Sequence, residues 1–219
     1  MKIMKTIIEK IDKNQKNTDI IREAGRILKE GGLVAFPTET VYGLGADALN
    51  EDAAKKIYAA KGRPSDNPLI IHITNMKALD KIVSEVPEKA VKVAEKYWPG
   101  PLTMIFNKSD IVPYGTTGGL DTVAVRMPVD EIAREVIDAG GGYIAAPSAN
   151  TSGRPSPTTA QHVAEDLTGR VDMIVDGGAV EIGVESTILD VTVEPPMILR
   201  PGAITKEMFE EVIGEVTVD

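Results

Sequence analysis

Short apolar runs alternate along this chain with longer stretches of helical periodicity, and this alternation limits the folds that it can adopt. The stretch 18–32 has apolar residues at positions 20, 21, 24, 27 and 28 and ends in two glycines, which predicts a helix. The run LVAFP that follows it, 33–37, is short and apolar, as a buried strand is. A chain that alternates in this way folds into a sheet covered by helices, so we predict the α/β class.

The same reading divides the rest of the chain. We expect helices over 51–62, 77–98 with a break at Pro87, 129–142 and 158–170, and strands over 68–73, 102–108, 122–128, 143–150, 171–178, 184–193 and 197–202. The last three strands leave no room for helices between them, which favours antiparallel pairing. No repeat, low-complexity tract or long linker interrupts the chain. We therefore expect one domain over residues 1–219, with its motifs between about 33 and 202.

Composition excludes several classes of protein. The chain has no cysteine, which rules out disulfides and thiolate-bound metal and favours a reducing cytoplasm. Its N-terminus is too interrupted by charge for a signal peptide, and no apolar run is long enough to span a membrane, so we expect a cytoplasmic protein. The net charge is −9, and 155–219 carries three cations against thirteen carboxylates. General nucleic-acid binding needs a basic face, which this balance disfavours.

Familiar catalytic motifs are missing from the sequence. It has no Gly-Lys dipeptide and hence no Walker P-loop, no G-x-S-x-G, and no H-E-x-x-H, since its two histidines are His72 and His162. Residues 43–48 read G-x-G-x-x-A, which resembles a dinucleotide-binding fingerprint. The next helix starts near residue 50 or 51, too late for its N-terminus to meet a pyrophosphate. We expect these glycines to form tight turns at the edge of a cleft instead.

Polar residues follow several of the expected strands at a spacing of two. Thr38 and Thr40 come after one apolar run, Ser148 and Asn150 after another, and a third ends at Arg126. In extended chain, residues i and i+2 point to the same side. The carboxyl ends of strands border the ligand crevice of α/β folds, so these side chains should converge on one site.

Two cations one residue apart, Lys61 and Arg63, enter the expected site through a helix-to-strand loop. A lysine is a mobile point charge and an arginine a planar fork, and together they suit a polyphosphate. The alternative for such a pair is a solvated loop, and for the S-x-N pair a turn with side chain–backbone bonds. Arg200 is one of the few cations of the acidic third and is followed by Pro-Gly, which favours a role in binding.

Seven segments of the chain match a known pattern. In order they are FPTETVYGLG, KGRPSDNPL, WPGPLT, VAVRMP, APSANTSGRPSPT, ESTI and ILRPG. Together they resemble the YrdC-like family of threonylcarbamoyl-AMP synthases. The resemblance implies a single-domain twisted mixed sheet flanked by helices, with a concave, positively lined cavity. Some members carry a further C-terminal domain after a linker, and this chain resembles the single-domain form.

The resemblance also implies an activity. Members of the family are nucleotidyltransferases that make threonylcarbamoyl-AMP from L-threonine, bicarbonate and ATP and release pyrophosphate. A partner transferase then modifies adenosine 37 of tRNA. Mg²⁺ would arrive with ATP, without a dedicated set of protein ligands. Two alternatives remain open: a paralogue that uses another carbamoyl-type substrate, and a non-catalytic module that binds double-stranded RNA weakly.

Site residues carry over by position. The family's K-x-R and S-x-N tetrad is present, and the catalytic residues implied are Lys61, Arg63, Ser148 and Asn150. The residues implied to hold ATP are Arg63, Asn67, Thr122, Ser148, Ser156 and Arg200, with Lys61 near the phosphates. Those implied to hold threonine are Thr40, His72, Arg126, the backbone at Ala146, and Ser186.

Overall fold

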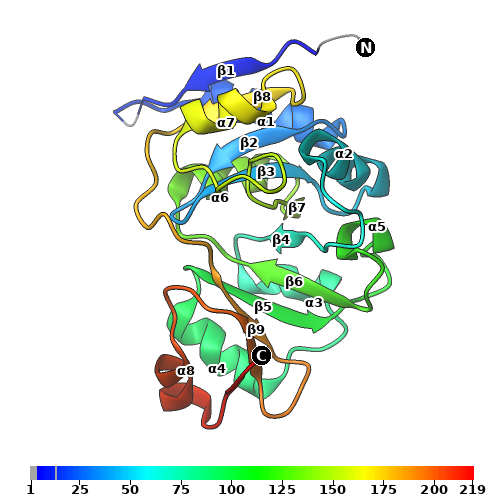
Figure 1. Ribbon diagram of the computed structural model, residues 1–219, viewed down its shortest axis with the longest axis vertical. Helices are drawn as coiled ribbons and strands as arrows, with labels where there is room; N and C mark the ends of the chain where they lie inside the picture. The colour runs from blue at the N-terminus through cyan, green and yellow to red at the C-terminus, as the bar shows by residue number, and fades with distance from the viewer. Residues whose placement is uncertain (1–3, 13) are drawn as a thin grey trace.

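One continuous sheet of 11 strands runs along the molecule in the order β1-β8-β2-β3-β7-β4-β6-β5-β9-β10-β11 (Figure 1). The computed structural model describes residues 4–12 and 14–219. The strands are β1 (Ile7–Lys10), β2 (Val34–Pro37), β3 (Tyr42–Asp47), β4 (Ile70–His72), β5 (Leu102–Asn107), β6 (Thr122–Arg126), β7 (Ile144–Ala145), β8 (Met173–Asp176), β9 (Thr187–Asp190), β10 (Met197–Arg200) and β11 (Thr217–Val218). Parallel and antiparallel pairs both occur, so the sheet is mixed.

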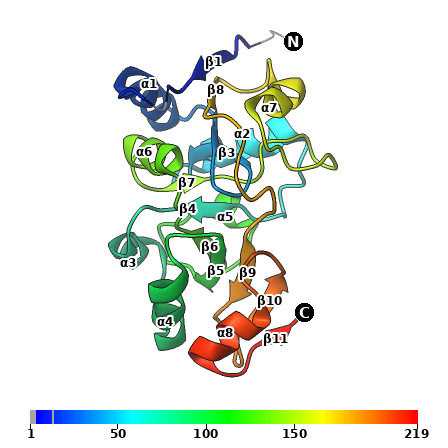
Figure 2. The same ribbon diagram turned by 90° about the vertical axis from the view of Figure 1, so that its left-hand side faces the viewer.

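Helices cover this sheet. They are α1 (Thr18–Lys29), α2 (Glu51–Lys61), the short 3-10 helix η1 (Met76–Ala78), α3 (Leu79–Ile82), α4 (Glu88–Tyr97), α5 (Tyr114–Thr117), α6 (Glu131–Ala139), α7 (Ala160–Leu167) and α8 (Lys206–Ile213). In Figure 2, α1, α6, α3 and α4 follow one another along one side of the sheet, and α7 lies on the other. The predicted α/β class is confirmed. No helix among the described residues is long and apolar enough to cross a bilayer.

Strand β2 is apolar throughout because both of its faces are covered. Val34 and Phe36 belong to a hydrophobic cluster with α1 and α6, whereas Ala35 on the opposite face belongs to the larger cluster that contains Leu44 and Ile57. All five side chains are essentially inaccessible to solvent. A strand enclosed in this way reads as an uninterrupted apolar run, which is why the sequence signal was strong.

Two predictions about the late strands had different outcomes. β9 and β10 pair antiparallel, as expected from their short connection. β8 does not join them, because it runs parallel to β1 and β2 near the opposite edge of the sheet. Helix α7 precedes β8 and carries the chain back across the sheet, and a helical crossover of this kind produces parallel pairing.

The glycines of segment 43–48 do not form turns, so that prediction was wrong. They lie in β3, which pairs antiparallel with β2, and neither Gly43 nor Gly45 has a positive φ. Their role is close packing, because a Cβ on Gly45 would come within 2.7 Å of the Phe36 ring. A side chain there would force neighbouring strands and side chains apart.

Regular pairing is very short in the middle of the sheet. The expected strand 143–150 forms ladder pairs only at Ile144 and Ala145, which face β3 on one side and β4 on the other. Beyond them the backbone leaves the ladder, and Ser148 forms a single bridge with Gly43. The chain that carries the S-x-N pair therefore emerges as a loop beside β3.

Candidate active site

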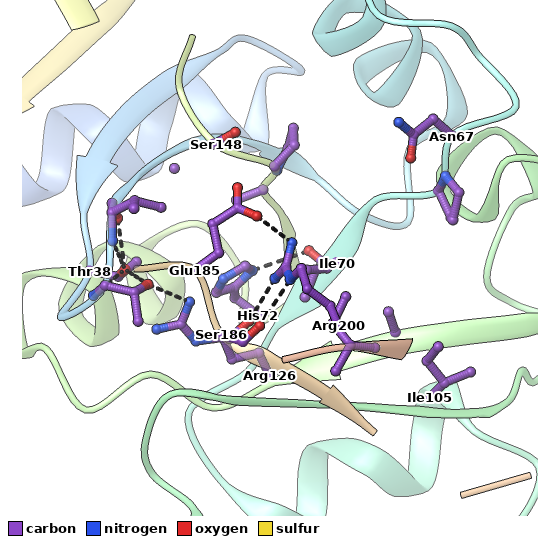
Figure 3. Close-up of a pocket in the computed structure, with 18 of the residues that line it drawn as sticks. Thr38, Asn67, Ile70, His72, Ile105, Arg126, Ser148, Glu185, Ser186 and Arg200 are labelled. Atoms are coloured by element: carbon purple, nitrogen blue, oxygen red, sulfur yellow. Dashed lines mark hydrogen bonds and ion pairs between the residues drawn. The ribbon is translucent and has the colours of Figure 1, made fainter. Parts of the chain in front are cut away.

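A cavity of about 260 Å³ opens next to this short central pairing (Figure 3). Its lining residues are Thr38, Thr40, Val41, Gly43, Arg63, Asn67, Pro68, Ile70, His72, Ile105, Ala124, Arg126, Ala146, Pro147, Ser148, Glu185, Ser186, Ile188, Leu199 and Arg200. Three arginines and one glutamate supply the charged groups of this lining. The wall therefore carries an excess of positive charge, as a site for anionic ligands requires.

Arg126 is held at one end of the cavity by a buried ion pair. Its Nη2 donates to Glu39 Oε1 at 2.7 Å and its Nη1 donates to Thr40 Oγ1 at 2.9 Å. Both charged side chains are only 5% exposed. Among the described residues, the Arg126 Nε–H is a buried donor without a partner, so this guanidinium keeps a free hydrogen bond beside the cavity.

His72 lies on the cavity wall as a neutral imidazole. Its Nδ1 is 3.1 Å from the Ile70 carbonyl oxygen, which can only accept, so Nδ1 carries the proton and Nε2 remains an acceptor. Burial lowers the pKa of His72 to about 3, and the positive charge of Arg126 adds to the effect. A neutral imidazole can accept a hydrogen bond from an ammonium or hydroxyl group but contributes no charge.

We expect the His72 imidazole to show no protonation between pH 5 and 8 in NMR spectra of ring carbons and protons. The folded pKa lies below the ordinary value of about 6.5, so the unfolded state binds the proton first. This group therefore makes the protein less stable as the pH falls from about 6.5 towards 3. His162, the chain's other histidine, is exposed and gives a separate signal. Titration of His72 near its ordinary pKa would contradict the buried neutral assignment.

Arg200 and Glu185 also line the cavity, next to Ser186. Arg200 Nη1 donates to Glu185 Oε2 at 2.6 Å, while Nε and Nη2 donate to the carbonyl and hydroxyl of Ser186 at 3.0 and 3.1 Å. The Ser186 hydroxyl also lies 2.7 Å from that of Thr103. Ser156 donates to the second oxygen of Glu185 at 2.9 Å. These contacts fix Arg200 in one orientation (Figure 3).

Lys61 lies behind the cavity wall rather than in an exposed loop. It is the last residue of α2 and only 3% exposed. Its ammonium donates to the carbonyl of Ser148 and, at 2.5 Å, to that of Asn150. Burial lowers the pKa of Lys61 to about 8, and the neighbouring Arg63 charge adds to this. The K-x-R and S-x-N motifs are therefore joined through backbone oxygens, and Lys61 fixes the loop that carries Ser148.

The loop after α2 places Arg63 and Asn67 on the cavity wall. Gly62 ends the helix with a φ of 63°, a conformation that favours glycine, and the chain turns there towards β4. Arg63 Nη2 donates to Asn67 Oδ1 at 2.7 Å and to the Pro68 carbonyl at 3.0 Å. These hydrogen bonds within the loop before β4 hold the Arg63 guanidinium at the cavity wall.

The structure brings most of the expected site residues together but not all of them. Among the described residues, Lys61, Thr122, Asn150 and Ser156 lie outside the cavity lining. Thr122 is on β6 two and four residues before the lining residues Ala124 and Arg126, so it continues the same face beyond the cavity. Ser156 reaches the site through Glu185.

The expected polar groups of Asn150 and Ala146 are engaged within the protein. Asn150 donates to the carbonyls of Thr151 and Arg154, both at 2.9 Å, which is the turn-forming alternative weighed for the S-x-N pair. Its Oδ1 is buried without a partner among the described residues. Ala146 lines the cavity, and its N–H donates to Ile70 O at 2.9 Å. Any backbone contact from Ala146 to a ligand would therefore use its carbonyl.

Sequence reasoning missed two acidic residues of the site, Glu39 and Glu185. Glu39 lies between Thr38 and Thr40, and a pattern of polar residues at a spacing of two does not include the residue between them. Glu185 opens the ESTI segment that supplied Ser186. Both glutamates lie inside segments that match the family pattern, and this position could have indicated that they belong to the site.

Comparison with known proteins places the chain in a family. Residues 26–202 match the Sua5/YciO/YrdC family model, whose description reads "telomere recombination". The chain belongs to the Sua5/YciO/YrdC family. The resemblance inferred from the seven segments is thereby confirmed.

Relatives within the Sua5/YciO/YrdC family are close to this chain. A protein of Pyrococcus abyssi named threonylcarbamoyl-AMP synthase is 58% identical over 198 residues, which cover 90% of this chain and 58% of that protein. One of Bacillus subtilis with the same name is 52% identical over 220 residues, covering 100% of this chain and 64% of the relative. The chain thus spans about three fifths of the length of these relatives.

A solved structure of the same family has the same fold. The crystal structure of P. abyssi Sua5 complexed with L-threonine superposes with a TM-score of 0.95 at 55% sequence identity. The match covers 98% of this chain and 63% of that one.

Proposed function

We propose that this chain is a threonylcarbamoyl-AMP synthase that joins L-threonine, bicarbonate and ATP with release of pyrophosphate. The observation that carries the proposal is one cavity lined by three arginines with different neighbours. Arg126 with neutral His72 suits an amino acid, and Arg63 with Arg200 suits a phosphate chain. The names of the relatives and the threonine complex of the P. abyssi protein support the same reading.

The amino-acid end would hold threonine by its carboxylate and hydroxyl. A guanidinium binds a carboxylate with directed N–H donors, and Arg126 retains a free Nε–H beside the cavity. Thr40 and Ser186 line the wall on either side, where a hydroxyl could be recognised. Ala146 would contribute its carbonyl, and His72 an acceptor nitrogen.

The reaction then needs alignment more than acid–base chemistry. Threonine's neutral amine and bicarbonate give a carbamate and one molecule of water. A carbamate oxygen then attacks the α-phosphorus of ATP, and the bond from that phosphorus to the leaving pyrophosphate breaks. The main obstacle is repulsion between anions, which Arg63, Arg200 and Lys61 would reduce by fixed positive charge. Ser148 would orient the nucleotide or the carbamate, and Lys61 and Asn150 would hold the Ser148 loop in place. Mg²⁺ would enter with ATP and screen the charge of its phosphates.

The product would be a substrate for a transferase that acts on tRNA. An acyl adenylate is a reactive mixed anhydride, which suits transfer of the threonylcarbamoyl group to a nucleoside amine. Direct RNA binding remains a secondary hypothesis, since the net charge of −9 disfavours it. A paralogue with another carbamoyl-type substrate would use the same phosphate end but a different amino-acid end.

We expect the purified chain to release pyrophosphate from ATP only when both threonine and bicarbonate are present. The measurement is a coupled pyrophosphate assay, with each substrate omitted in turn and serine offered in place of threonine. A folded sample that binds ATP and threonine but releases no pyrophosphate would contradict the proposal. Release supported by a different amino acid or by carbamoyl phosphate alone would favour the paralogue.

A further inference from the structure

Glu185 is the one carboxylate among the described residues that line the cavity, and the proposed reaction gives it no role. It is followed by the buried Ser186, lies two residues before β9 begins, and is partly exposed. Its Oε2 accepts from Arg200 Nη1 at 2.6 Å and its Oε1 accepts from Ser156 Oγ at 2.9 Å. Figure 3 shows it projecting into the middle of the site, above His72 and facing Arg200.

Glu185 lies within the electrostatic range of all three cations assigned to the phosphates. Burial lowers the pKa values of Lys61, Arg63 and Arg200, and the negative charge of Glu185 opposes that lowering in each case. The carboxylate therefore lies close to the cations assigned to the phosphates and is hydrogen-bonded to one of them.

A carboxylate at that place is unfavourable for a polyphosphate unless a cation lies between them. Of the five N–H donors of Arg200, two go to Ser186 and one on Nη1 goes to Glu185, so one N–H on each of Nη1 and Nη2 is left for a ligand. A phosphate that binds these donors shares the single positive charge of Arg200 with the Glu185 carboxylate. Like charges in a partly closed site then repel each other more strongly than they would in water.

Mg²⁺ is the cation whose chemistry fits this position. It prefers hard oxygen ligands and is commonly bound by one or two carboxylates together with phosphate oxygens and water. Among the described residues no group of three or more acidic, histidine or cysteine side chains is placed to enclose a metal. Among the described residues that line the cavity, Glu185 is the one carboxylate that could bind such an ion together with the phosphates.

We propose that Glu185 is the protein's ligand for the Mg²⁺ ion that accompanies ATP, an inference that rests on the proposed function. The other cation in the reaction is the ammonium group of threonine. The observations favour the metal, because both oxygens of Glu185 face Ser156 and Arg200, which are assigned to the nucleotide, and neither contacts Arg126 or Thr40.

The test compares nucleotide binding with and without the metal. Calorimetry would measure the affinity of α,β-methylene-ATP, which is not cleaved at the α-phosphorus, in Mg²⁺ and in EDTA. We expect Mg²⁺ to strengthen binding to the wild-type chain by about tenfold and to have less than about a threefold effect on Glu185→Gln. Without metal, Glu185→Gln should bind the nucleotide as tightly as the wild type or more tightly, because a repulsive charge has been removed.

Matched variants separate the metal role from a general effect. Glu181→Gln removes an exposed carboxylate from the same segment and should keep the full Mg²⁺ effect. Glu185→Asp keeps the charge on a shorter side chain and should keep part of it, which provides a second variant if Glu185→Gln folds poorly. Electron paramagnetic resonance with Mn²⁺ and the nucleotide analogue should show weaker ordering of the metal in Glu185→Gln than in the wild type.

Three results would overturn the proposal. The first is an unchanged Mg²⁺ effect in folded Glu185→Gln. The second is a loss of threonine affinity in that variant with the metal effect intact, which would assign Glu185 to the ammonium group. The third is failure of the wild-type chain to bind the nucleotide at all, which would overturn the proposed function and the metal assignment together. The first two results leave the proposed function standing.

Discussion

Replacing Arg126 by methionine is expected to lower the free energy of unfolding by about 3–5 kcal/mol, because it leaves a buried carboxylate without its cation. The guanidinium and the Glu39 carboxylate are each only 5% exposed, so little solvent is in contact with the pair. Methionine retains much of the side-chain volume, so the change in the free energy of unfolding should contain little contribution from a new cavity. Urea denaturation followed by circular dichroism measures the change.

A double variant identifies the cause of that loss. Glu39→Gln combined with Arg126→Met removes the unpaired charge, and we expect it to recover at least about 1 kcal/mol relative to Arg126→Met alone. If the two substitutions are additive, the ion pair contributes nothing and Arg126 stabilises the fold through packing only. Threonine binding should be lost in both variants, because both lack the guanidinium.

Replacing Lys61 by methionine is expected to reduce both stability and turnover. The substitution leaves the carbonyls of Ser148 and Asn150 without the buried ammonium, at a cost of about 1–3 kcal/mol. It also removes a positive charge from the phosphate end of the site, for which we expect at least a tenfold fall in turnover, about 1.4 kcal/mol. Thermal denaturation and the pyrophosphate assay measure the two effects.

The control for Lys61 lies on the same helix. Lys55 is 63% exposed at its side chain and pairs only with an exposed aspartate, so Lys55→Met should change neither property measurably. Turnover must be compared per folded molecule at a temperature where the Lys61 variant is native. Full stability in Lys61→Met would mean that water replaces the ammonium and that the lysine does not hold the loop.

The elements that the sequence predicted well are those whose burial pattern is unambiguous. The run at 33–37 is enclosed on both faces and reads as a strand, and the helix after residue 18 has one clear apolar face. β3 was missed because Gly43 and Gly45 resemble turn residues, whereas tertiary packing requires small residues there. The parallel placement of β8 depends on where α7 returns the chain, which no local pattern records.

The sequence predicted those site residues that follow strands, but it did not predict the environment of residues that lie elsewhere. Thr40, Arg126 and Arg200 meet at the cavity because strand ends converge there. The burial of Lys61 was not visible in the sequence, since a lysine at the end of a helix is usually solvated. Its partners are backbone oxygens of a loop that is distant in sequence. Every residue has a backbone oxygen, so the amino-acid sequence does not reveal such partners.

The two-residue strand β7 leaves the middle of the sheet with little regular pairing. In the middle of the sheet, ladder pairing of the described chain is limited to Ile144 and Ala145. Beyond them, isolated backbone hydrogen bonds such as that from Ala146 N–H to Ile70 O join the loop to the neighbouring strands. Of the residues that line the cavity, Thr40 comes from the β2–β3 side of β7, whereas His72 and Arg126 come from the β4–β6 side. A ligand that contacts residues from both sides links the two parts of the sheet across β7, so we expect its binding to stabilise this weakly paired region against local opening.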